Sequence, residues 1–561
     1  MSRSINIPVS RAFDFGLRPE TRHLILLVTA TAAVTLIPTL FRGIPSNFDL
    51  SNHFRFALPF YDALQSGHLY PGWLAESNNG FGDPSFRFYP PALYYLLALM
   101  RAVFGNWYAA SVLTFAIIST LGSLGMYAWA RQFTSSQTAM WAGIIYSLAP
   151  YHLNQFFQAL LLAEFAAASI LPFAFLFTER VCRHRRSKDI AGLAGVYALL
   201  LLTHLPLAVI GSIALAVYAL LRSDRTKIVR TMCAFGVSVG IGLAASACYW
   251  ATMMAEVKWI HGNDFNPEGG ISYRDNFVLA TFSPDFLNVW WMNILLLCTV
   301  AMFWPALALA SRSARQEDFD RRRIVAVVTL LLSLTLFMAT PLSRPIWAHV
   351  HLLQETQFPW RWLALTSMMG SLLLALSIPF WTRLLKTRKR PLVIVACGTV
   401  AMSLAFSFGH IVREARWLTS AQFEQTLSDL RGSRSIHFWL PVWADNGLPE
   451  MQARVDAGNR AVKVESWEPE KRTFQVSAGD ATEARIKTFF YPHWTATANG
   501  HVLPIRPDKQ GAMLIALPAD AATVQLEFRE PPKTRVARAA SFGGWFLIGM
   551  LFMPISFRRR K

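Results

Sequence analysis

The sequence predicts a mainly α-helical, polytopic transmembrane bundle of about eleven to thirteen spans, followed by an external β-sandwich-like domain and a final transmembrane helix. Of the 561 residues, 53% are hydrophobic and only 16% are charged, whereas soluble proteins usually carry about 25% charged residues. Apolar runs close to the ~20 residues that span a bilayer recur along most of the chain. We therefore expect a membrane protein.

The formal net charge of +19 is carried by short basic segments that flank the apolar runs. These segments are 1–23, 182–189, 222–230, 311–323, 382–391 and 558–561. Lys- and Arg-rich loops beside membrane spans are cytoplasmic under the positive-inside rule. The charge therefore indicates topology, and the lack of a basic aromatic platform argues against nucleic-acid binding.

Placing these segments in the cytoplasm divides the chain into four parts. They are a cytoplasmic N-terminus (1–23), a transmembrane domain (24–410) with its first external loop at 42–89, an external, periplasmic β-rich domain (411–540), and a C-terminal transmembrane helix with a basic cytoplasmic tail (541–561). Both termini are then cytoplasmic. We expect a multi-pass protein of the bacterial inner membrane.

Two segments of the transmembrane domain need separate treatment. Residues 190–221 join two cytoplasmic segments, so we expect them to cross twice and to bend at His204-Leu205-Pro206, because proline cannot continue the hydrogen bonding of a helix. If Arg131 lies in a cytoplasmic loop, residues 90–104 do not cross the membrane completely. A re-entrant or juxtamembrane helix is expected there, and 155–180 is expected to return to the cytoplasm.

The segment 411–540 has a different composition from the rest of the chain. Its short, partly alternating runs are AVKVESW, TFQVSA, ARIKTFFY, MLIALP and TVQLEF, separated by turn-formers such as Ala-Asn-Gly. Such runs between turn signals are typical of strands. We predict a small β-sandwich, connected to the membrane part by a helical or irregular stretch at 411–440.

The first external loop begins with NFDLSNHFRF, in which Asp49 and His53 lie on one face if the segment is helical. Asp49 is a candidate general base or ligand, because partial burial would raise the pKa of a carboxyl group toward useful base strength. The alternative is that Asp49 caps the next helix. His53 is either a ligand or a structural hydrogen-bonding residue.

Two further candidates lie within or beside apolar runs. Glu164 is inside a run and His204 is at the predicted bend. Charges within spans are costly and mark functional interiors by default. Glu164 is thus a second acid or cation ligand, or it is neutralised by an arginine or by His204. The loop 257–286 is interpreted as a gate over the site.

Several motifs occur in a characteristic order. They are Gly-x-Leu-Tyr-Pro-x-Trp at 67–73, Gly-x-Gly-x-Pro at 80–84, Phe-Tyr-Pro-Pro at 88–91, LLAEFAAASILPF at 161–173, LLLTHLPLA at 200–208, QFPWRWLAL at 357–365 and FYPHWTATANG at 490–500. In this order the chain resembles integral membrane glycosyltransferases of the C-type (GT-C) superfamily. It is most similar to YfhO-like proteins and to the bacterial membrane family labelled "6-pyruvoyl-tetrahydropterin synthase-related", a label that does not imply pterin chemistry.

The resemblance implies transfer of a sugar from a polyprenyl-phosphate donor to an envelope glycan or lipid acceptor at the outer face of the membrane. In that superfamily an acidic residue of the first external loop is catalytic, and Asp49 is the residue that matches, with Glu164 as the second catalytic candidate. The candidate substrate-binding residues are His53, Arg361, His204, Gln357, Trp360 and Arg344, with His349 and His351 nearby. Arg361 either grips phosphate oxygens with its planar fork or is an interfacial arginine that snorkels.

Metal dependence stays open, because the chain lacks the Asp-x-Asp or Glu-Asp pair that many relatives carry in this loop. The hard ligands at hand are Asp49 and His53, with Glu164 and Asp83 as additions. We expect at most a weakly held Mg²⁺ or Mn²⁺ ion. The metal-free alternative assigns the positive charge to Arg361 and its neighbours.

Two rival functions fit the same composition. A lipid or solute transporter (flippase) would also have many spans and interior charges, but no internal repeat or matching pair of broken spans is evident. A non-catalytic scaffold would keep the fold and present the β domain to a partner. Loss of sugar from a supplied donor separates the enzyme from both rivals.

Overall fold

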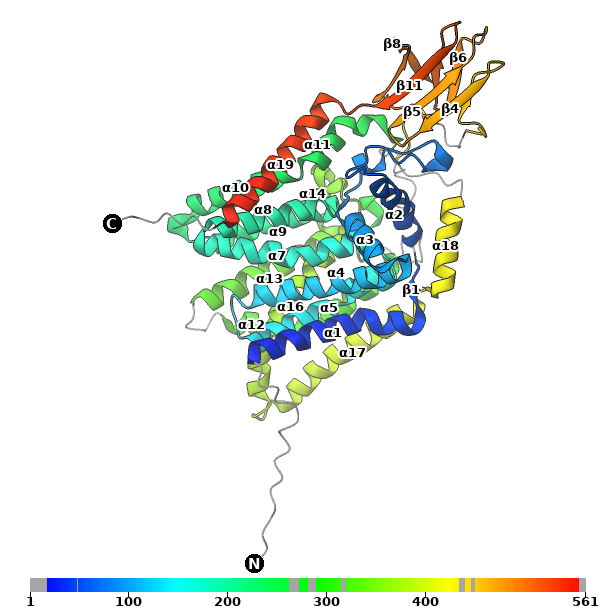
Figure 1. The fold of residues 1–561 in the computed structure, drawn as a ribbon. Helices are drawn as coiled ribbons and strands as arrows, with labels where there is room; N and C mark the ends of the chain where they lie inside the picture. The colour runs from blue at the N-terminus through cyan, green and yellow to red at the C-terminus, as the bar shows by residue number, and fades with distance from the viewer. Residues whose placement is uncertain are drawn as a thin grey trace, which may run out of the picture.

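The computed structural model describes residues 18–47, 49–261, 272–280, 289–313, 319–432, 439–444 and 449–553. Long helices lie side by side in one bundle, and a β domain stands at one end of it (Figure 1). Within these ranges, nine helices are long and apolar enough to cross a membrane. The predicted fold class is confirmed.

The nine helices alternate with shorter ones along the chain. They are α1 (Pro19–Arg42), α4 (Trp107–Ala130), α7 (Leu162–His184), α9 (Leu205–Arg222), α10 (Ile228–Ala245), α12 (Val289–Ser313), α13 (Phe319–Ala339), α16 (Trp362–Leu384) and α17 (Arg390–Glu414). The shorter or more polar helices are α2 (Leu50–Gln65), α3 (Ala92–Phe104), α5 (Ser136–Ser147), α6 (Pro150–Phe157), α8 (Ser187–Leu201), α11 (Ala247–Glu256), α14 (Arg344–His349), α15 (His351–Gln354), α18 (Ser420–Gly432) and α19 (Pro532–Phe552).

Polar contacts fix the direction of the first helices. Arg131, just after α4, pairs with Glu20 at the start of α1 at 2.8 Å. At the same end, His23 of α1 lies 2.8 Å from Ser136, the first residue of α5. Helix α4 is therefore antiparallel to α1, and α3 is left as a short helix at the other end, where α2 packs against it. The segment Ala92–Phe104 is thus an apolar helix shorter than the nine candidate spans, and its re-entrant or juxtamembrane placement stays a prediction.

The run at 155–180 differs from its prediction as one continuous span. Helix α6 ends at Phe157 and α7 begins at Leu162, because Leu160 between them adopts a left-handed backbone conformation with φ 51°. Helices α5 and α6 together lead from the α1 start back toward α7. The hairpin of α8 and α9 bends before Leu205, as the proline there predicts.

The β domain is built from two antiparallel sheets with the strand orders β3-β6-β10-β9 and β4-β5-β11-β7-β8. Its strands are β3 (Val455–Asp456), β4 (Val462–Trp467), β5 (Lys471–Val476), β6 (Glu483–Phe489), β7 (Trp494–Ala498), β8 (His501–Leu503), β9 (Ile505–Pro507), β10 (Ala512–Ala516) and β11 (Ala522–Phe528). Alternate residues of β5 and β11 are buried, and Phe474, Ile486 and Val524 from both sheets share one core. The predicted β-sandwich is confirmed.

The loop that follows α2 packs into the β domain. Trp73 is fully buried in the β-domain core and meets Trp494 edge to face at 5.8 Å between ring centroids. Gly82 has φ 84°, and a Cβ there would lie 2.1 Å from the Trp73 indole nitrogen. Trp73 and Gly82 of this loop therefore serve to dock the loop in the β domain.

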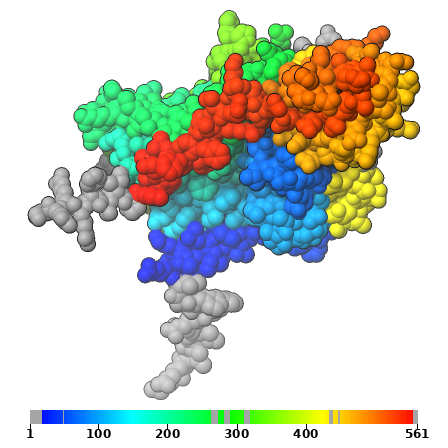
Figure 2. Space-filling view, turned by 45° about the horizontal axis from the view of Figure 1, so that its top comes forward, coloured from blue at the N-terminus to red at the C-terminus, as the bar shows by residue number. Residues whose placement is uncertain are grey.

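The final helix α19 begins at Pro532, earlier than the predicted start at 541, and residues 554–561 of the predicted basic tail lie outside the described part, as do residues 1–17. Figure 2 shows α19 on the surface of the molecule, running from the β domain along the bundle. It packs against α8, α10 and α11. The helix therefore ties the β domain to the membrane bundle from its C-terminal side.

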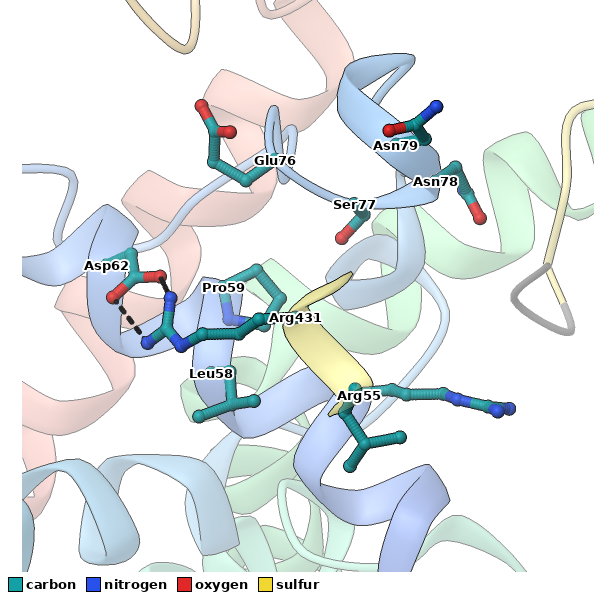
Figure 3. A pocket seen from close by; sticks show the side chains of 10 residues that line it. Arg55, Leu58, Pro59, Asp62, Glu76, Ser77, Asn78, Asn79 and Arg431 are labelled. Atoms are coloured by element: carbon teal, nitrogen blue, oxygen red, sulfur yellow. Dashed lines mark hydrogen bonds and ion pairs between the residues drawn. The ribbon is translucent and has the colours of Figure 1, made fainter. Parts of the chain in front are cut away.

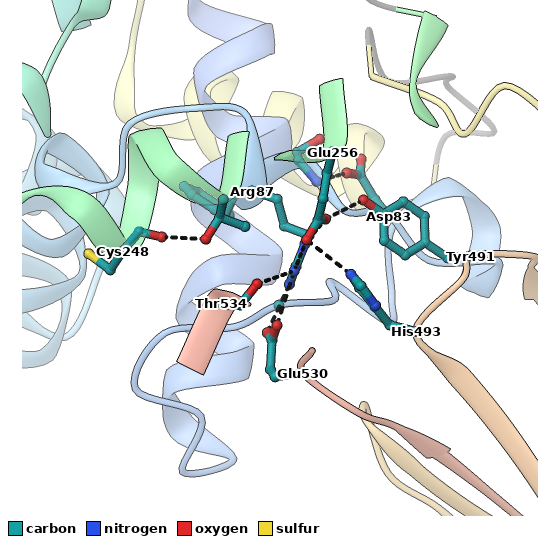
Figure 4. A network of polar contacts seen from close by, with 12 residues as sticks. Asp83, Arg87, Cys248, Glu256, Tyr491, His493, Glu530 and Thr534 are labelled. Atoms are coloured by element: carbon teal, nitrogen blue, oxygen red, sulfur yellow. Dashed lines mark hydrogen bonds and ion pairs between the residues drawn. The ribbon is translucent and has the colours of Figure 1, made fainter. Parts of the chain in front are cut away.

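A buried network centred on Arg87 joins the loop, α11, the β domain and α19 (Figure 4). Arg87, 2% exposed, donates hydrogen bonds to Glu256 and, at 2.8 Å, to Glu530. Glu256 also accepts from the Tyr491 hydroxyl at 2.7 Å and contacts His493 Nε2 at 3.0 Å. Burial alone would raise the pKa of Glu256, but the bonds from Arg87, His493 and Tyr491 lower it to about 2.

We predict that this network makes stability depend on acid. The pKa of Glu256 lies below its ordinary value of 4.5, so its contribution is fully present above pH 4.5 and is lost as the pH falls from 4.5 toward 2. Glu256→Gln should lower stability near neutral pH by on the order of 3 kcal/mol, the scale for breaking a buried ion pair. Thermal unfolding from pH 7 to pH 3 measures both effects.

The matched control is Glu527→Gln, because Glu527 pairs with Arg529 on the exposed surface of the same domain. It should change stability by less than about 0.5 kcal/mol. An acid-dependent loss that is the same in wild type and in Glu256→Gln would contradict the assignment to Glu256.

The topology gives a second prediction. A reporter fused after Arg388, in the basic turn between α16 and α17, should be cytoplasmic, whereas one fused after Gly432, at the end of α18 beside α2, should be external. Reporter enzymes that work on only one side of the membrane measure this. If the Gly432 fusion is cytoplasmic, Asp49 and the β domain lie on the cytoplasmic side as well.

Candidate functional site

The chain leaves α1 through a fixed turn and then enters α2. The short strand β1 (Ile44–Pro45) pairs with β2 (Trp417–Leu418), and Gly43 approaches Leu418 so closely that a Cβ would overlap its carbonyl. Helix α2 then begins at Leu50 and buries an aromatic face that includes Phe54 and Phe60. This anchoring holds the start of α2 in one position against the bundle.

Asp49 and His53 lie on one face of this segment, as the spacing predicts. Their closest atoms, Asp49 Oδ2 and His53 Nε2, are 3.3 Å apart. Asp49 stands at the N-cap position of α2, but its side chain makes no capping hydrogen bond within the described chain. Its Oδ1 instead accepts a hydrogen bond from Asn52 Nδ2 at 2.8 Å, and 23% of the side chain is exposed. The capping alternative is therefore not supported by the geometry.

The pKa of Asp49 is shifted in the direction opposite to the expected one. Burial would raise it, but the charge and hydrogen bond of His53, the hydrogen bond from Asn52 and the charge of Arg361 together lower it. The predicted rise is therefore wrong, because it considered burial without the neighbouring donors. Asp49 stays ionised at neutral pH and is a hydrogen-bond acceptor there.

A tyrosine fixes His53 from its other side. His53 is 2% exposed, and its Nδ1 lies 3.1 Å from the Tyr94 hydroxyl. Burial raises the pKa of Tyr89, with Asp49 adding to the rise, while a hydrogen bond with Tyr94 and the charge of Arg361 oppose it. The four side chains thus form a polar chain from Tyr89 through Tyr94 and His53 to Asp49. Neither tyrosine was predicted from the sequence as a site residue, although both belong to the FYPPALYY stretch.

The second half of the site is a buried ion pair. Arg361 Nε donates to Glu164 Oε2 at 2.9 Å, and the two side chains are 6% and 2% exposed. Glu164 Oε1 accepts from Gln155 Nε2 at 2.7 Å and from the Tyr151 hydroxyl. Of the two alternatives for Glu164, neutralisation by an arginine is the arrangement observed.

Arg361 has one donor group to spare. Its Nη1 donates to the Thr356 carbonyl, its Nε to Glu164, and none of the bonds among described residues uses Nη2. The guanidinium also lies over the Phe358 ring at 4.6 Å. Arg361 stands in a short 3₁₀ turn, Pro359–Arg361, immediately before α16, so its position is set by a rigid element.

The two halves of the site lie at the same end of the bundle. The charge of Arg361 acts on Asp49 and on His204, and His204 is also within electrostatic reach of His53. His204 caps α9, where its Nδ1 accepts from the Leu207 amide at 3.3 Å. The structure therefore brings together five of the predicted site residues, namely Asp49, His53, Glu164, His204 and Arg361.

The remaining candidates lie at the margin of this cluster. The Trp360 ring stacks on Phe358 at 4.7 Å and its indole donates to Asn276. Gln357 adopts φ 62° in the turn before Phe358. Arg344 is exposed and lies over the Phe277 ring, and His349 and His351 are exposed as well. The structure does not bring these last three residues to the cluster.

Two other predictions from the sequence concern a metal site and a gate over the site. Among the described residues, no three His, Cys, Asp or Glu side chains gather as a metal-binding group. The predicted Mg²⁺ or Mn²⁺ site on Asp49 and His53 stays a prediction. Most of the proposed gate at 257–286, including Asp264, lies outside the described residues, and His261 Nε2 in its first part contacts the Ala444 carbonyl.

Two cavities lie near α2. The larger, of about 650 Å³, is formed by the β1–α2 connection, the end of α6, the start of α12 and the end of α17. The smaller, of about 160 Å³, lies between α2, the loop at 76–79 and α18 (Figure 3). Asp62 of α2 and Arg431 of α18 form an ion pair of 2.7 Å at its edge.

Fold and site together define a polytopic membrane protein with a buried charge cluster and a C-terminal β domain. Residues 86–411, more than half of the chain, match the family model described as "6-pyruvoyl-tetrahydropterin synthase related domain; membrane protein". The chain belongs to this family, which confirms the family predicted from its motifs. No curated protein sequence matches the chain.

Solved structures similar to this chain include the following three. The Archaeoglobus fulgidus oligosaccharyltransferase in the apo form has 13% identity over 72% of this chain and 57% of its own, with a TM-score of 0.46. ArnT from Cupriavidus metallidurans bound to undecaprenyl phosphate has 13% identity over 74% and 78%, with a TM-score of 0.42. The mycobacterial arabinofuranosyltransferase AftD has 16% identity over 72% and 27%, with a TM-score of 0.43. The chain spans less than two thirds of the length of the oligosaccharyltransferase.

The site predicts a structural role for Glu164. Glu164→Gln removes the only carboxylate hydrogen-bonded to Arg361 among the described residues, so stability should fall by on the order of 3 kcal/mol. Glu164→Gln/Arg361→Gln should recover part of this loss, since no buried charge is then left alone. Chemical unfolding of the singles, the double variant and the exposed control Glu424→Gln measures the coupling. Unchanged stability with lost turnover would instead make Glu164 a reacting group.

Proposed function

We propose that the protein is a membrane glycosyltransferase that moves a sugar from a polyprenyl-phosphate donor to an envelope glycan or lipid acceptor at the outer face of the inner membrane. The observation that carries the proposal is that an ionised carboxylate, Asp49, and a buried guanidinium, Arg361, lie at one end of the bundle, and that Arg361 Nη2 donates no hydrogen bond to the described residues. The donor class is the one that the resemblance to GT-C glycosyltransferases implies.

The reaction needs a base and a positive charge from the protein. An acceptor hydroxyl oxygen forms a bond to the anomeric carbon of the sugar, and the bond from that carbon to the phosphate oxygen breaks. The electron pair leaves with the polyprenyl phosphate, and the hydroxyl proton must be taken up. A base beside the hydroxyl and a cation beside the phosphate lower the barrier.

Asp49 is the base, and Arg361 is the cation beside the phosphate. Asp49 accepts a hydrogen bond from the acceptor hydroxyl and takes its proton as the new bond forms. Because its pKa is lowered, Asp49 is a weak base and takes the proton only when formation of the new bond has already made the hydroxyl more acidic. Arg361 Nη2 donates to a phosphate oxygen while Nε stays on Glu164. Glu164 is then a positioning residue that holds the guanidinium.

Depth in the bilayer supports the same division. Asp49 follows the end of the candidate span α1, and Arg361 stands at the start of the candidate span Pro359–Leu384. A polyprenyl phosphate keeps its chain in the bilayer and its phosphate at the boundary. A base and a cation at that boundary meet the sugar without drawing the lipid out of the membrane.

Substitution of Asp49 tests the proposal. Asp49→Asn keeps the size but loses the charge and basicity, so turnover should fall by roughly 10²-fold or more while donor binding is kept. Asp49→Glu should retain part of the activity. Release of polyprenyl phosphate by purified protein in lipid nanodiscs measures turnover, and circular dichroism measures folding.

The matched control is Asp62→Asn on the same helix, where the carboxylate pairs with Arg431 away from the cluster. Its turnover should stay close to that of wild type. If Asp49→Asn misfolds while activity per folded molecule is unchanged, Asp49 has a structural role and the base lies elsewhere.

Removal of divalent cations gives a further prediction. We expect full turnover in excess EDTA, because Arg361 already supplies a fixed positive charge beside Asp49. Turnover is measured before and after chelation, with Mg²⁺ or Mn²⁺ added back. Loss of turnover that either ion restores would assign the phosphate charge to a bound cation instead.

A further inference from the structure

The larger cavity, of about 650 Å³, is not used by the chemistry above. Its volume falls within the ~300–1,000 Å³ typical of small-ligand sites. It lies at the same end of the bundle as the charge cluster, because its wall includes Asn47, which precedes Asp49 by two positions, and the ends of α6 and α17.

One wall of the cavity is aromatic. Trp290 and Trp291 stand in the first turn of α12, and the Trp291 ring packs on His410 of α17 with 4.2 Å between ring centroids. The indole N–H of Trp291 donates to Asn154 Oδ1 at 2.9 Å, which fixes this ring. Trp290 is half-buried, and the described bonds leave its N–H unengaged.

Other residues that line the cavity are polar. Gln158 Oε1 is buried, yet within the described chain it accepts no hydrogen bond. Glu414 at the end of α17 and Arg416 just beyond it are exposed and add a carboxylate and a guanidinium to the lining. A buried carbonyl oxygen without a donor is costly unless a ligand or water supplies one. Indole faces beside amide and charged groups fit a ligand with flat C–H faces and many hydroxyls, which describes a saccharide.

Helix α6 connects this cavity to the charge cluster. Its Tyr151 and Gln155 bond to Glu164, whereas Asn154 holds Trp291 and Gln158 lines the cavity. The helix has only eight residues and is buried along its length. A ligand in the cavity is therefore one short, rigid element away from the group that positions Arg361.

We propose that the cavity is the acceptor subsite and that it binds a saccharide by stacking on Trp290 and by hydrogen bonds to Gln158 and Glu414. The acceptor is then a glycan. The assignment as an acceptor site rests on the proposed function, whereas saccharide binding can be measured without catalysis.

Saturation-transfer NMR tests the binding directly. The full-length protein in lipid nanodiscs is presented with maltotriose, chitotriose and mannotriose in an Asp49→Asn background, and no sugar donor is added, so that no transfer occurs. At least one should receive saturation on its ring C–H protons. Trp290→Ala should weaken its binding roughly tenfold, the scale for losing one stacked aromatic face.

Two further variants keep the test decisive. Trp141→Ala, an exposed tryptophan on α5, is the matched control and should bind like the parent. Glu414→Ala, at an exposed position, should weaken binding even if Trp290→Ala fails to fold. Absence of saturation on all three saccharides, or equal binding by Trp290→Ala, Glu414→Ala and the control, overturns the proposal.

The outcomes separate this proposal from the proposed function. Saccharide binding that depends on Trp290, together with full turnover of Asp49→Asn, would keep the saccharide site and reject the role of Asp49. Loss of turnover in Asp49→Asn, together with saccharide binding that Trp290→Ala does not weaken, would reject only the saccharide site in the cavity. In wild type, Trp290→Ala should raise the KM for a glycan acceptor and leave kcat and the KM for the donor nearly unchanged.

Discussion

Burial of Arg361 is the constraint on which the site depends. A guanidinium removed from water needs a carboxylate and further acceptors, and Glu164 and the Thr356 carbonyl meet that need. Because Glu164 is itself held by Tyr151 and Gln155, the cation cannot move without breaking bonds on α6 and α7. His53 and Asn52 lower the pKa of Asp49 most, and the fixed positive charge of Arg361 adds to this shift.

A second buried arginine docks the β domain on the helical bundle. Arg87 joins Glu256 at the end of α11 to Glu530 before α19, while Tyr491 and His493 bring the β domain to the same carboxylate. The loop that carries Arg87 leads directly into Tyr89 and Tyr94. Docking of the β domain and the geometry around His53 therefore share one short stretch of backbone.

The sequence predicted what depends on local pattern. Apolar runs and basic loops predicted the helical bundle, Pro206 the bend between α8 and α9, and alternating runs the sandwich. The spacing of Asp49 and His53 predicted their pairing. Contacts between distant residues had no local signal: Arg87 and Glu530 are 443 positions apart. The direction of the Asp49 pKa shift was missed because it depends mainly on the side-chain rotamers of His53 and Asn52, which spacing does not specify, and in smaller part on the distant Arg361.

The central claim is that the Asp49–Arg361 cluster transfers a sugar rather than moving a lipid or solute. The most direct measurement follows two quantities in the same proteoliposomes: release of polyprenyl phosphate from a labelled polyprenyl-phosphate sugar, and movement of the intact donor across the bilayer. We expect release of polyprenyl phosphate that depends on the acceptor and is weakened by Arg361→Lys. Movement of the donor should be no faster than in protein-free liposomes. Rapid donor movement without any release would contradict it.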